Sequence, residues 1–222
     1  MRLLLIGYGR MGRMVEELAK DGGVEIAGRI DVDNLTSDWP QADVAIDFTV
    51  PDAVPANFVK LAERKTNIVI GTTGWGPHEE ELRRVAFRTG IGVVASANFS
   101  IGVNLFRIFA AEAARLMATR PEYGAWIHEA HHAAKKDAPS GTALMLQDAM
   151  KAAGFGRPVD VSSTRAGMIP GTHTVGFDGP SDTIELTHTA RDRRGFAAGA
   201  LLAARWIAGR RGWFTMADVL ER

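Results

Sequence analysis

The start of the chain constrains the fold more than any other segment, because a short apolar run leads directly into three closely spaced glycines. Residues 2–7 read RLLLIG, and residues 7–12 read GYGRMG. An apolar run that ends in glycine predicts a buried parallel strand, and the apolar spacing of residues 13–22 predicts a helix after it. The pattern G-x-G-x-x-G between a strand and a helix is typical of dinucleotide-binding domains.

Each glycine of this loop has its own expected role. Gly7 allows a tight turn, Gly9 lets a pyrophosphate approach the backbone, and Gly12 lets the helix pack on the strand. The N–H groups at the start of the helix would then face the phosphates. The alternative interpretation is a glycine turn that binds no ligand.

Asp31 ends the second expected strand, at the place where an acid commonly binds the ribose hydroxyls of a dinucleotide. Its carboxylate would repel the extra phosphate of NADPH, so NADH is modestly favoured over NADPH as the cofactor. Arg29 lies close enough in the sequence to weaken this preference. A carboxylate at a strand end can also be an ordinary surface group.

Strands alternate with helices up to about residue 100. This rhythm predicts an α/β fold, with a Rossmann-type nucleotide domain over residues 1–100 in which helices cover both faces of a parallel sheet. The expected strands are 2–7, 24–31, 42–50, 66–74 and 91–100, and the expected helices are 13–22, 51–65 and 78–90.

After residue 100 the pattern changes to one long helix and several alternating, β-branched segments. This change predicts a second, α+β domain with a mixed open sheet over residues 101–204, and residues 205–222 are expected to pack back on the nucleotide domain. The expected strands are 123–132, 159–167, 172–179 and 182–190, and the expected helices are 103–121, 142–154 and 196–209. The helix over 196–209 is rich in small residues and could return to the first domain.

The helix over residues 103–121 is the longest one expected. Apolar residues recur along it at helical spacing and are expected to form its apolar side. They are Leu105, Ile108, Phe109, Ala113 and Leu116.

Three strand ends of the nucleotide domain carry small and hydroxyl-bearing residues, namely 47–51 (DFTVP), 71–75 (GTTGW) and 97–100 (ANFS). In an open parallel sheet, ligands bind outside the carboxyl ends of the strands. The three segments are therefore expected to line one crevice that suits a flat ring such as nicotinamide. Each segment alone could equally be ordinary loop chemistry, with Thr49 and Ser100 as turn or cap residues.

The densest group of reactive side chains lies in residues 129–143, which read EAHHAAKKDAPSGTA. Ser140 is expected to cap the helix that follows, so that Gly141 and Thr142 present unpaired backbone N–H groups to a carboxylate or a phosphate. Lys135 can add a cation to the same anion site. The alternative is a solvated polar loop before a capped helix.

Two adjacent histidines leave the preceding strand, and neighbouring strand residues point to opposite faces. One of His131 and His132 could therefore face a crevice while the other supports it, and an imidazole can donate a proton near neutral pH. Glu129 and the two histidines lack the HExxH spacing of a helical zinc site, so no metal is expected.

Composition excludes several classes of function. The chain has 222 residues, with 26 Lys and Arg against 26 Asp and Glu, so no overall field favours nucleic acid or an anionic membrane. No apolar stretch approaches the roughly 20 residues that span a bilayer. There are no cysteines, which excludes disulfides and thiolate chemistry and is compatible with a reducing, cytoplasmic location.

The segment EAHHAAKKDAPSGTA resembles the motif E-[AL]-H-H-x-x-K-x-D-x-P-S-G-T-A of the bacterial dihydrodipicolinate reductase family, also called 4-hydroxy-tetrahydrodipicolinate reductases. Further segments resemble that family in the same order, so the resemblance covers essentially the whole chain. They are GYGRMGR, DFTVP, GTTGW, ANFSIGVNLF, RAGMIPGTHTVGFDG, ELTHTARDRRGFAAGAL and FTMADVL.

This resemblance implies an NADH- or NADPH-dependent oxidoreductase that reduces a small cyclic dicarboxylate to tetrahydrodipicolinate, on the diaminopimelate route of lysine biosynthesis. It also implies a homotetramer that assembles through the sheet of the second, substrate-binding domain. His131 is the implied proton donor and Lys135 its catalytic partner. The segment from Asp31 to Asp43 is compressed relative to the family, which affects the adenosine side of the cofactor site.

The expected site residues form two groups, one for the cofactor and one for the substrate. The expected cofactor-binding residues are Gly7, Gly9, Arg10, Met11, Gly12, Asp31, Phe48, Thr49, Gly71, Thr72, Thr73, Ala97, Asn98 and Phe99. The expected substrate-binding residues are His132, Lys135, Ser140, Gly141, Thr142 and Arg193, although Asp192 replaces the small residue that usually precedes this arginine.

Two other functions are compatible with the nucleotide domain alone. An imine or amino-acid dehydrogenase, such as an aspartate-dehydrogenase-like enzyme, would share that domain but has no reason to join H-H-x-x-x-K to P-S-G-T-A. A non-catalytic NAD sensor or scaffold would keep the glycine loop and could lose His131 and Lys135, and both are present.

Overall fold

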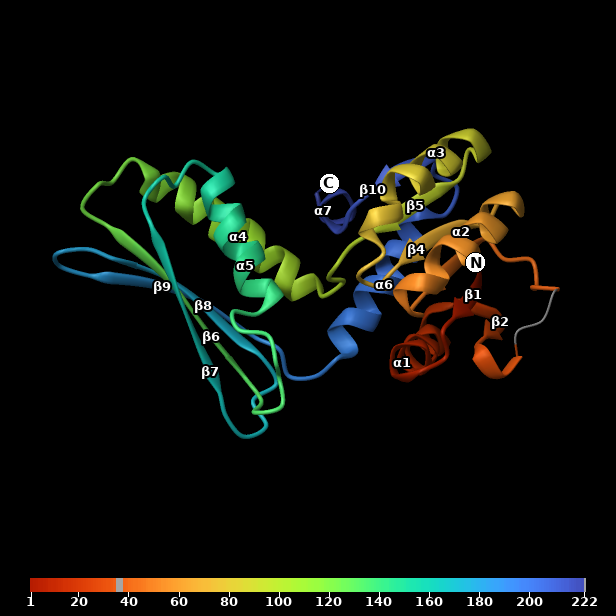
Figure 1. Cartoon of the computed structure of the whole chain (residues 1–222), viewed down its shortest axis with the longest axis horizontal. Coiled ribbons are helices and arrows are strands. Elements are labelled where there is room, and N and C mark those ends of the chain that lie inside the picture. Colours follow the sequence, from red (N-terminus) through yellow and green to blue (C-terminus); the bar gives the residue numbers. More distant parts are fainter. Residues whose placement is uncertain (35–37, 222) are drawn as a thin grey trace. The chain divides into compact units, whose positions relative to one another are not determined.

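The computed structural model describes residues 1–34 and 38–221, and the chain forms two compact units (Figure 1). The first unit combines Met1–Ile101 with the chain from Arg193 onward, and the second is Gly102–Asp192. The first division lies next to the expected boundary at residue 100. The second lies twelve residues before the expected return at residue 205, because the whole of helix α6 (Arg194–Ile207) packs with the first unit.

The first unit is built on a six-stranded sheet in which all neighbouring strands are parallel, as expected for a Rossmann-type domain. Its central strands are almost entirely apolar and buried, as is usual for a parallel sheet covered on both faces. In spatial order the strands are β10 (Gly212–Phe214), β5 (Gly92–Ala95), β4 (Asn67–Ile70), β3 (Val44–Asp47), β1 (Arg2–Ile6) and β2 (Glu25–Ile30).

Helices cover both faces of this sheet, so alternate residues of a strand belong to different hydrophobic cores. On β1, Leu4 and Ile6 belong to one core and Leu3 and Leu5 to the other. Helices α2 (Val54–Glu63) and α3 (Glu79–Thr89) pack in the first core; α1 (Arg10–Ala19), α6 and α7 (Met216–Leu220) pack in the second. Short 3-10 turns cover Lys20–Gly22, Val32–Asn34, Pro51–Ala53 and Gly76–His78.

The second unit has a four-stranded mixed sheet, as the sequence predicted. Strand β6 pairs with β7 in parallel and with β8 antiparallel, and β8 pairs with β9 antiparallel. Helices α4 and α5 lie over one face of this sheet (Figure 1). The bounds are β7 (Val159–Arg165), β6 (Gly124–His131), β8 (Thr172–Asp178), β9 (Thr183–Thr189), α4 (Ile101–Ala118) and α5 (Gly141–Ala152).

The expected apolar side of α4 was wrong. Phe106, Ala110 and Ala114 are buried in the core of the second unit, whereas Leu105, Phe109 and Leu116 of the expected side are exposed in this chain. Apolar residues surround most of this helix, so their spacing alone did not select a face. The alanines on the buried side allow the helix backbone to approach the sheet closely.

The other face of the mixed sheet is polar and carries no described helix of this unit. Threonine side chains pair across it, with Thr172 Oγ1 3.1 Å from Thr189 Oγ1 and Thr174 Oγ1 3.0 Å from Thr187 Oγ1.

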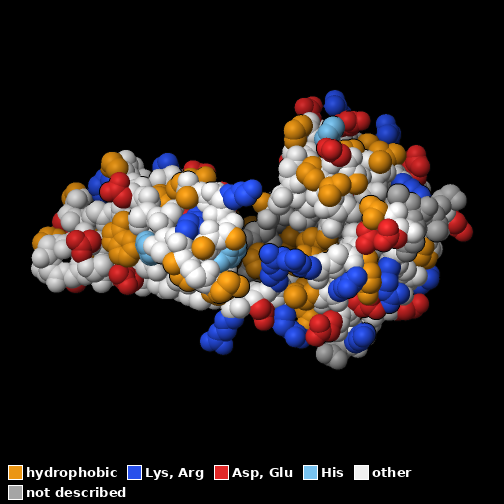
Figure 2. All heavy atoms as spheres, turned by 60° about the horizontal axis from the view of Figure 1, so that its bottom comes forward, with side chains coloured by type: hydrophobic (Ala, Val, Ile, Leu, Met, Phe, Trp, Pro, Cys, Tyr) orange, Lys and Arg blue, Asp and Glu red, His pale blue; other side chains and the backbone are white. Residues whose placement is uncertain are grey.

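Acidic and basic side chains are interspersed over the molecular face shown in Figure 2, in keeping with the zero net charge. Among the described helices, none combines the length and apolarity required to cross a membrane.

Candidate active site

The glycine loop has the packing that the sequence predicted. Gly7 has a φ of +84°, and a Cβ there would lie 2.3 Å from the carbonyl oxygen of Phe48. A Cβ at Gly12 would lie 2.4 Å from the carbonyl oxygen of Gly7, whereas a Cβ at Gly9 would meet nothing within 4 Å. The loop is therefore closely packed at Gly7 and Gly12 and faces open space at Gly9, which fits an approaching pyrophosphate.

The start of α1 adds an electrostatic contribution to this loop. The helix begins at Arg10, and the preceding Gly9 provides no side-chain cap. The first N–H groups of a helix have no partner within it, and they carry partial positive charge. An anion beside Gly9 would therefore meet both open space and oriented donors.

Asp31 lies beside the glycine loop. Its Oδ2 accepts a hydrogen bond from the Tyr8 backbone N–H at 3.2 Å, and its Oδ1 accepts one from the Val32 N–H at 2.9 Å. The carboxylate also borders a cavity of about 320 Å³ that Gly7, Gly9, Phe48 and Thr49 help to line. This position suits the ribose-binding role expected for Asp31. Residues 35–37 of the compressed segment after Asp31 lie outside the described part of the chain.

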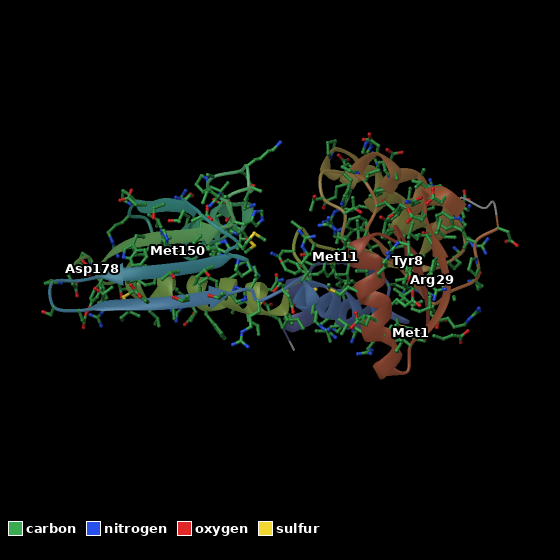
Figure 3. All side chains as sticks on the ribbon, turned by 90° about the horizontal axis from the view of Figure 1, so that it is seen from below. Met1, Tyr8, Met11, Arg29, Met150 and Asp178 are labelled. Atoms are coloured by element: carbon green, nitrogen blue, oxygen red, sulfur yellow. The ribbon has the colours of Figure 1, made fainter. Side chains whose placement is uncertain are left out.

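Arg29 is engaged by a carboxylate of the same unit. Its guanidinium binds Glu16, which also accepts a hydrogen bond from the Tyr8 hydroxyl, and it lies 5.6 Å from the centre of the Tyr8 ring (Figure 3). The hydrogen bonds from Arg29 and Tyr8 lower the pKa of Glu16 to about 2. Because Glu16 is a permanent counter-charge, Arg29 offers less attraction to an added phosphate than its place in the sequence suggested.

A second cavity, of about 490 Å³, lies at the carboxyl ends of β3, β4 and β5, and Phe48 borders both cavities. The three expected strand ends thus line adjoining cavities. Those that line the second one are Met11, Phe48, Gly71, Thr73, Ala97 and Phe99, together with Arg193 and Phe196.

Four of the expected cofactor residues do not line either cavity. Gly12 supports the loop, and Arg10 is exposed at the start of α1. Thr72 is buried and donates a hydrogen bond to Asp47, while Asn98 accepts one from the Ser100 N–H at 2.8 Å. Thr72 and Asn98 therefore support the strand ends.

Asp47 is a structural centre that the sequence did not reveal as such. This buried carboxylate accepts hydrogen bonds from the Thr49 N–H at 3.0 Å, the Thr49 hydroxyl at 2.6 Å, the Asn57 amide at 3.0 Å and the Thr72 hydroxyl at 3.0 Å. It joins the ends of β3 and β4 to α2. The only sequence signal is an acid that ends an otherwise apolar strand.

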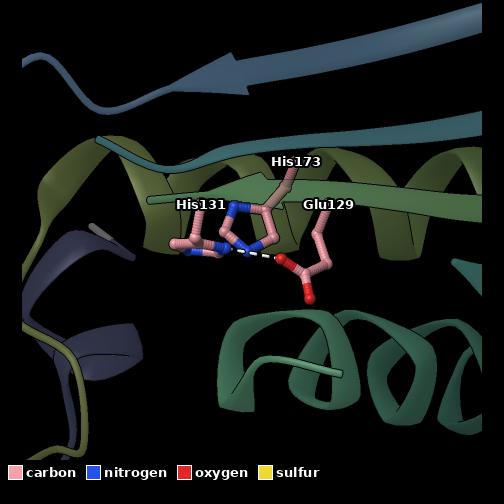
Figure 4. Close-up of side chains that lie close together, drawn as sticks. All are labelled: Glu129, His131 and His173. Carbon is pink, nitrogen blue, oxygen red and sulfur yellow. Dashed lines mark hydrogen bonds and ion pairs between the residues drawn. The ribbon is translucent and has the colours of Figure 1, made fainter. Parts of the chain in front are cut away.

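In the second unit, the strand geometry of β6 brings Glu129 and His131 together. Residues two apart on a strand share a face, and His131 Nδ1 lies 2.5 Å from Glu129 Oε2 (Figure 4). The Glu129 side chain is fully buried, and that of His131 is 12% exposed. His132 follows the strand and is half-buried, so the two adjacent histidines occupy different positions.

Three groups besides His131 donate four hydrogen bonds to the buried Glu129 carboxylate. Arg165 donates to both oxygens, at 2.9 and 2.6 Å, the Ser163 hydroxyl donates at 2.6 Å, and the Ser140 N–H donates at 3.1 Å. Burial alone would raise the pKa of Glu129, but these hydrogen bonds outweigh burial and lower the pKa to about 2. The carboxylate is therefore ionised at neutral pH.

His173 on β8 completes this cluster. Its Nε2 lies 3.0 Å from the Ser140 hydroxyl, and its ring meets the His131 ring edge-on with centroids 5.1 Å apart (Figure 4). Burial and the neighbouring His131 lower the pKa of His173 to about 4. His173 is therefore neutral near pH 7 and was not among the expected site residues.

The donor atoms of Glu129, His131 and His173 lie within 4.8 Å of one another, a spacing that could hold a metal ion. Both oxygens of Glu129 already accept several hydrogen bonds, including those from the Arg165 guanidinium. A metal ion would have to displace these donors beside a fixed positive charge. The donor set therefore suits an oriented imidazole better than a metal ion.

The loop before α5 carries Lys135, whose Nζ lies 2.7 and 2.8 Å from the two carboxylate oxygens of Asp137. The hydrogen bond from Lys135 lowers the pKa of Asp137. Arg165 also donates to the Asp137 carbonyl oxygen at 2.6 Å, so this arginine contacts both Glu129 and the Lys135 loop. Asp137 thus has a positioning role that its sequence context did not indicate.

Ser140 caps α5 as the sequence predicted, because its Oγ accepts a hydrogen bond from the Ala143 N–H at 3.2 Å. Gly141 and Thr142 form the first turn of this helix, where backbone N–H groups have no partner within the helix. His132, Lys135 and these three residues lie in the second unit. Arg193, also expected to bind substrate, lies in the first unit and borders the 490 Å³ cavity.

Comparison with known proteins identifies the family of this chain. Residues 1–99 match the model of "Dihydrodipicolinate reductase, N-terminus" and residues 102–220 that of "Dihydrodipicolinate reductase, C-terminus". The 4-hydroxy-tetrahydrodipicolinate reductase of Christiangramia forsetii is 36% identical over 100% of this chain and 98% of its own length. The enzyme of the same name from Methanoregula boonei is 38% identical, over 96% of this chain and 94% of its own.

The fold comparison agrees with the sequence comparison. A dipicolinate-bound dihydrodipicolinate reductase from Paenisporosarcina sp. TG-14 superposes with a TM-score of 0.82 at 21% identity, over 97% of each chain. An aspartate dehydrogenase from Thermotoga maritima superposes less well, with a TM-score of 0.52 at 14% identity, over 92% of this chain and 95% of its own. From the two family models and the full-length relatives together, this chain belongs to the dihydrodipicolinate reductase family and is an NAD(P)H-dependent oxidoreductase.

Proposed function

We propose that this chain is a 4-hydroxy-tetrahydrodipicolinate reductase, which reduces a cyclic dicarboxylate to tetrahydrodipicolinate in the diaminopimelate route of lysine biosynthesis. Relatives that carry this name match the chain over essentially its full length. The observation that carries the proposal within the structure is the pairing of two features. One is an open glycine loop on a parallel sheet, and the other is a buried Glu129–His131 pair beside the start of α5.

Two groups of residues in the first unit fit two parts of a dinucleotide, the pyrophosphate and the ribose on the adenosine side. Gly7, Gly9 and Gly12, with the N–H groups at the start of α1, would bind the pyrophosphate, and Arg10 would be close enough to contribute a cation. Asp31 would bind the ribose hydroxyls on the adenosine side, which supports NADH as the preferred cofactor.

The 490 Å³ cavity would hold the nicotinamide, which supplies a hydride when it is bound in reduced form. Met11, Phe48, Gly71 and Phe99 offer a mostly apolar lining that would orient the ring and exclude water. Arg193 borders the same cavity and is the one expected substrate-binding residue of this unit.

The residues of the second unit fit a dicarboxylate. The N–H groups of Gly141 and Thr142 and the side chains of His132, Lys135 and Ser140 would bind the two carboxylates of the ring. The cation of Lys135 would also favour negative charge that develops on the ring after hydride transfer. His131 would then donate a proton to the adjacent carbon, which completes the reduction.

The decisive test is an assay of the purified protein with freshly made condensation product of pyruvate and aspartate semialdehyde. We expect oxidation of NADH and, more slowly, of NADPH, and a His131→Gln variant should lose turnover while its NADH affinity stays near that of the unsubstituted protein. An aspartate oxidation assay with NAD is run in parallel. Activity in the aspartate oxidation assay alone would contradict the reductase function and support an aspartate-dehydrogenase-like one. Full turnover by His131→Gln would contradict the role of His131 as proton donor.

We also propose that the protein is a cytoplasmic homotetramer. The polar, uncovered face of the mixed sheet supports this assembly, because its threonine pairs present hydroxyls and a regular surface to a second copy. Light scattering coupled to size-exclusion chromatography measures the mass directly. A monomer at micromolar concentration would contradict the proposed assembly without affecting the proposed reaction.

A further inference from the structure

The hydrogen-bond network around Glu129 determines which nitrogen of His131 carries a proton. An ionised carboxylate can only accept hydrogen bonds, and Glu129 accepts them from Arg165, Ser163 and the Ser140 N–H. In the short contact between His131 Nδ1 and Glu129 Oε2, at 2.5 Å, the Nδ1–H group of His131 therefore donates a hydrogen bond to the carboxylate. The neutral imidazole consequently has its proton on Nδ1 and a lone pair on Nε2.

The position beside Nε2 of His131 is a glycine. The edge of the ring that carries Nε2 lies over Gly171, where a Cβ would be 3.1 Å from Nε2. Gly171 has a φ of +132°, a backbone conformation that side-chain-bearing residues rarely adopt. The ring is therefore held at Nδ1 by a buried acceptor and is bordered at Nε2 by a position that accommodates no side chain.

Other titratable groups near His131 do not replace Glu129 as the acceptor at Nδ1. They are Arg165 on β7, His173 on β8, and the Lys135–Asp137 pair in the loop before α5. His173 is neutral near pH 7 and therefore adds no second imidazolium. Lys135 and Arg165 are each bound to a carboxylate, so Glu129 is the acid in direct contact with His131.

We propose that Glu129 is a positioning residue for the reduction, which fixes the Nδ1–H tautomer and the orientation of His131 so that Nε2 is the atom that delivers the proton. Arg165 and Ser163 in turn hold the Glu129 carboxylate in place. This inference rests on the proposed reductase function for its catalytic consequence. The tautomer itself is a property of the free protein.

The 4-hydroxyl group and a ring hydrogen of the condensation product would leave as water, which creates the ring double bond. A reduced nicotinamide would supply a hydride to one carbon of this double bond, and the cationic His131 would protonate the adjacent carbon. The Nε2–H bond breaks, its electron pair stays on Nε2, and a new C–H bond forms with the electron pair of the reduced ring. His131 becomes neutral and retains Nδ1–H toward Glu129, and water restores the proton on Nε2.

The test uses Glu129→Gln, with Glu185→Gln as the matched control because Glu185 is exposed on β9 of the same unit. Histidine-selective 15N spectra of the free protein identify the tautomer of His131, whose signals are those lost in His131→Gln. We expect Nδ1–H in the unsubstituted protein and in Glu185→Gln, and a loss of this preference in Glu129→Gln. An unchanged Nδ1–H tautomer in Glu129→Gln would overturn the proposal.

Measurements of kcat and KM distinguish a positioning role of Glu129 from a purely structural one. We expect Glu129→Gln to lower kcat by roughly 10- to 100-fold, as the loss of the partner of a metal-bound histidine does, with the KM for NADH unchanged. The same substitution in a His131→Gln background should cause no further loss. An equal loss in both backgrounds would show a structural role and overturn the proposal.

Three other outcomes are possible. If Glu129→Gln fails to fold, Glu129→Gln/Arg165→Gln neutralises both partners of the buried pair, and its spectrum must show the same loss of tautomer preference. If the unsubstituted protein shows the Nδ1–H tautomer but does not oxidise NADH with the condensation product, the positioning of His131 stands and the proposed reaction fails. A mixed tautomer in the unsubstituted protein overturns the positioning even if the reductase assay succeeds.

Discussion

Arg165 and Glu129 lie on neighbouring parallel strands, and the guanidinium donates hydrogen bonds to both carboxylate oxygens, at 2.9 and 2.6 Å. Glu129 is fully buried, whereas 17% of the Arg165 side chain is exposed. The ion pair therefore closes the buried cluster from its solvent side. The same guanidinium reaches the Asp137 carbonyl oxygen, so it fixes both β6 and the loop that carries Lys135.

Replacement of Arg165 by Met should destabilise the second unit, because it leaves the buried Glu129 carboxylate without its counter-charge. We expect a fall in Tm of several degrees. Arg115→Met is the control, since Arg115 forms an exposed pair with Glu112 on α4, and such pairs contribute little to stability. Equal Tm values for the two variants would contradict the importance of the buried pair.

The stability of the protein should depend on the ionisation of Glu129 in acid. Its pKa is about 2 in the folded chain against an ordinary value of 4.5, so its contribution is complete above about pH 4.5 and is lost as the pH falls toward 2. The full contribution is roughly 3 kcal/mol. Urea unfolding measured from neutral pH down to about pH 3 should show a steeper loss than in Glu129→Gln. Parallel curves would contradict the assignment.

Replacement of Gly12 by Ala should damage cofactor binding, because the new Cβ would lie 2.4 Å from the Gly7 carbonyl oxygen and would displace the loop. We expect the Kd for NADH, measured by fluorescence titration, to rise at least about tenfold. Gly124→Ala is the control, since a Cβ there meets nothing within 4 Å and lies in the other unit. Unchanged NADH affinity in Gly12→Ala would show that the loop does not need this close packing.

Most elements of the fold could be predicted from the sequence because each is specified locally. The strand–helix rhythm of the first 100 residues and the Ser140 cap each depend on a few adjacent residues, and the structure has both. Strand β10 has only three residues and pairs with β5, more than 110 positions earlier, so no local pattern indicates it. The buried face of α4 depends on which side meets the sheet, and an almost entirely apolar helix does not specify this.

The candidate site was predictable in its residues but not in its supporting contacts. The segment 129–143 contains Glu129, His131, Lys135 and Ser140, and it indicated a reactive loop before a capped helix. Arg165 and His173, however, reach the cluster from β7 and β8, more than 30 positions away. Such contacts are set by strand pairing, which the spacing of residues along one segment does not determine.

The proposed preference for NADH should depend on the charge of Asp31, which borders the adenosine-side cavity. Asp31→Ser removes the charge that would repel an added phosphate, so the ratio of NADH to NADPH affinity should fall several-fold. Asp33→Ser, which removes an exposed acid two residues later, is the control. Because Asp31 also accepts a hydrogen bond from Tyr8, some loss of NADH affinity is expected as well. An unchanged ratio would place cofactor selection elsewhere.

Lys135 should affect the reduction far more than its neighbour Lys136 does. Lys135 is part-buried and held by Asp137 beside the start of α5, whereas Lys136 is exposed. Lys135→Ala removes a cation that would bind a substrate carboxylate and favour charge on the reduced ring, so kcat/KM for the condensation product should fall by roughly 10²- to 10³-fold. Lys136→Ala should retain nearly full activity.

The affinity for NADH distinguishes this role of Lys135 from a general effect on folding. Lys135 lies in the second unit and the glycine loop in the first, so the Kd for NADH should be the same in Lys135→Ala and in the unsubstituted protein. Asp137→Asn should lie between the two lysine variants in kcat/KM, because it keeps the cation and weakens the contact that positions it. If Lys135→Ala and Lys136→Ala lost activity equally, the cation of residue 135 would have no specific part in binding the dicarboxylate.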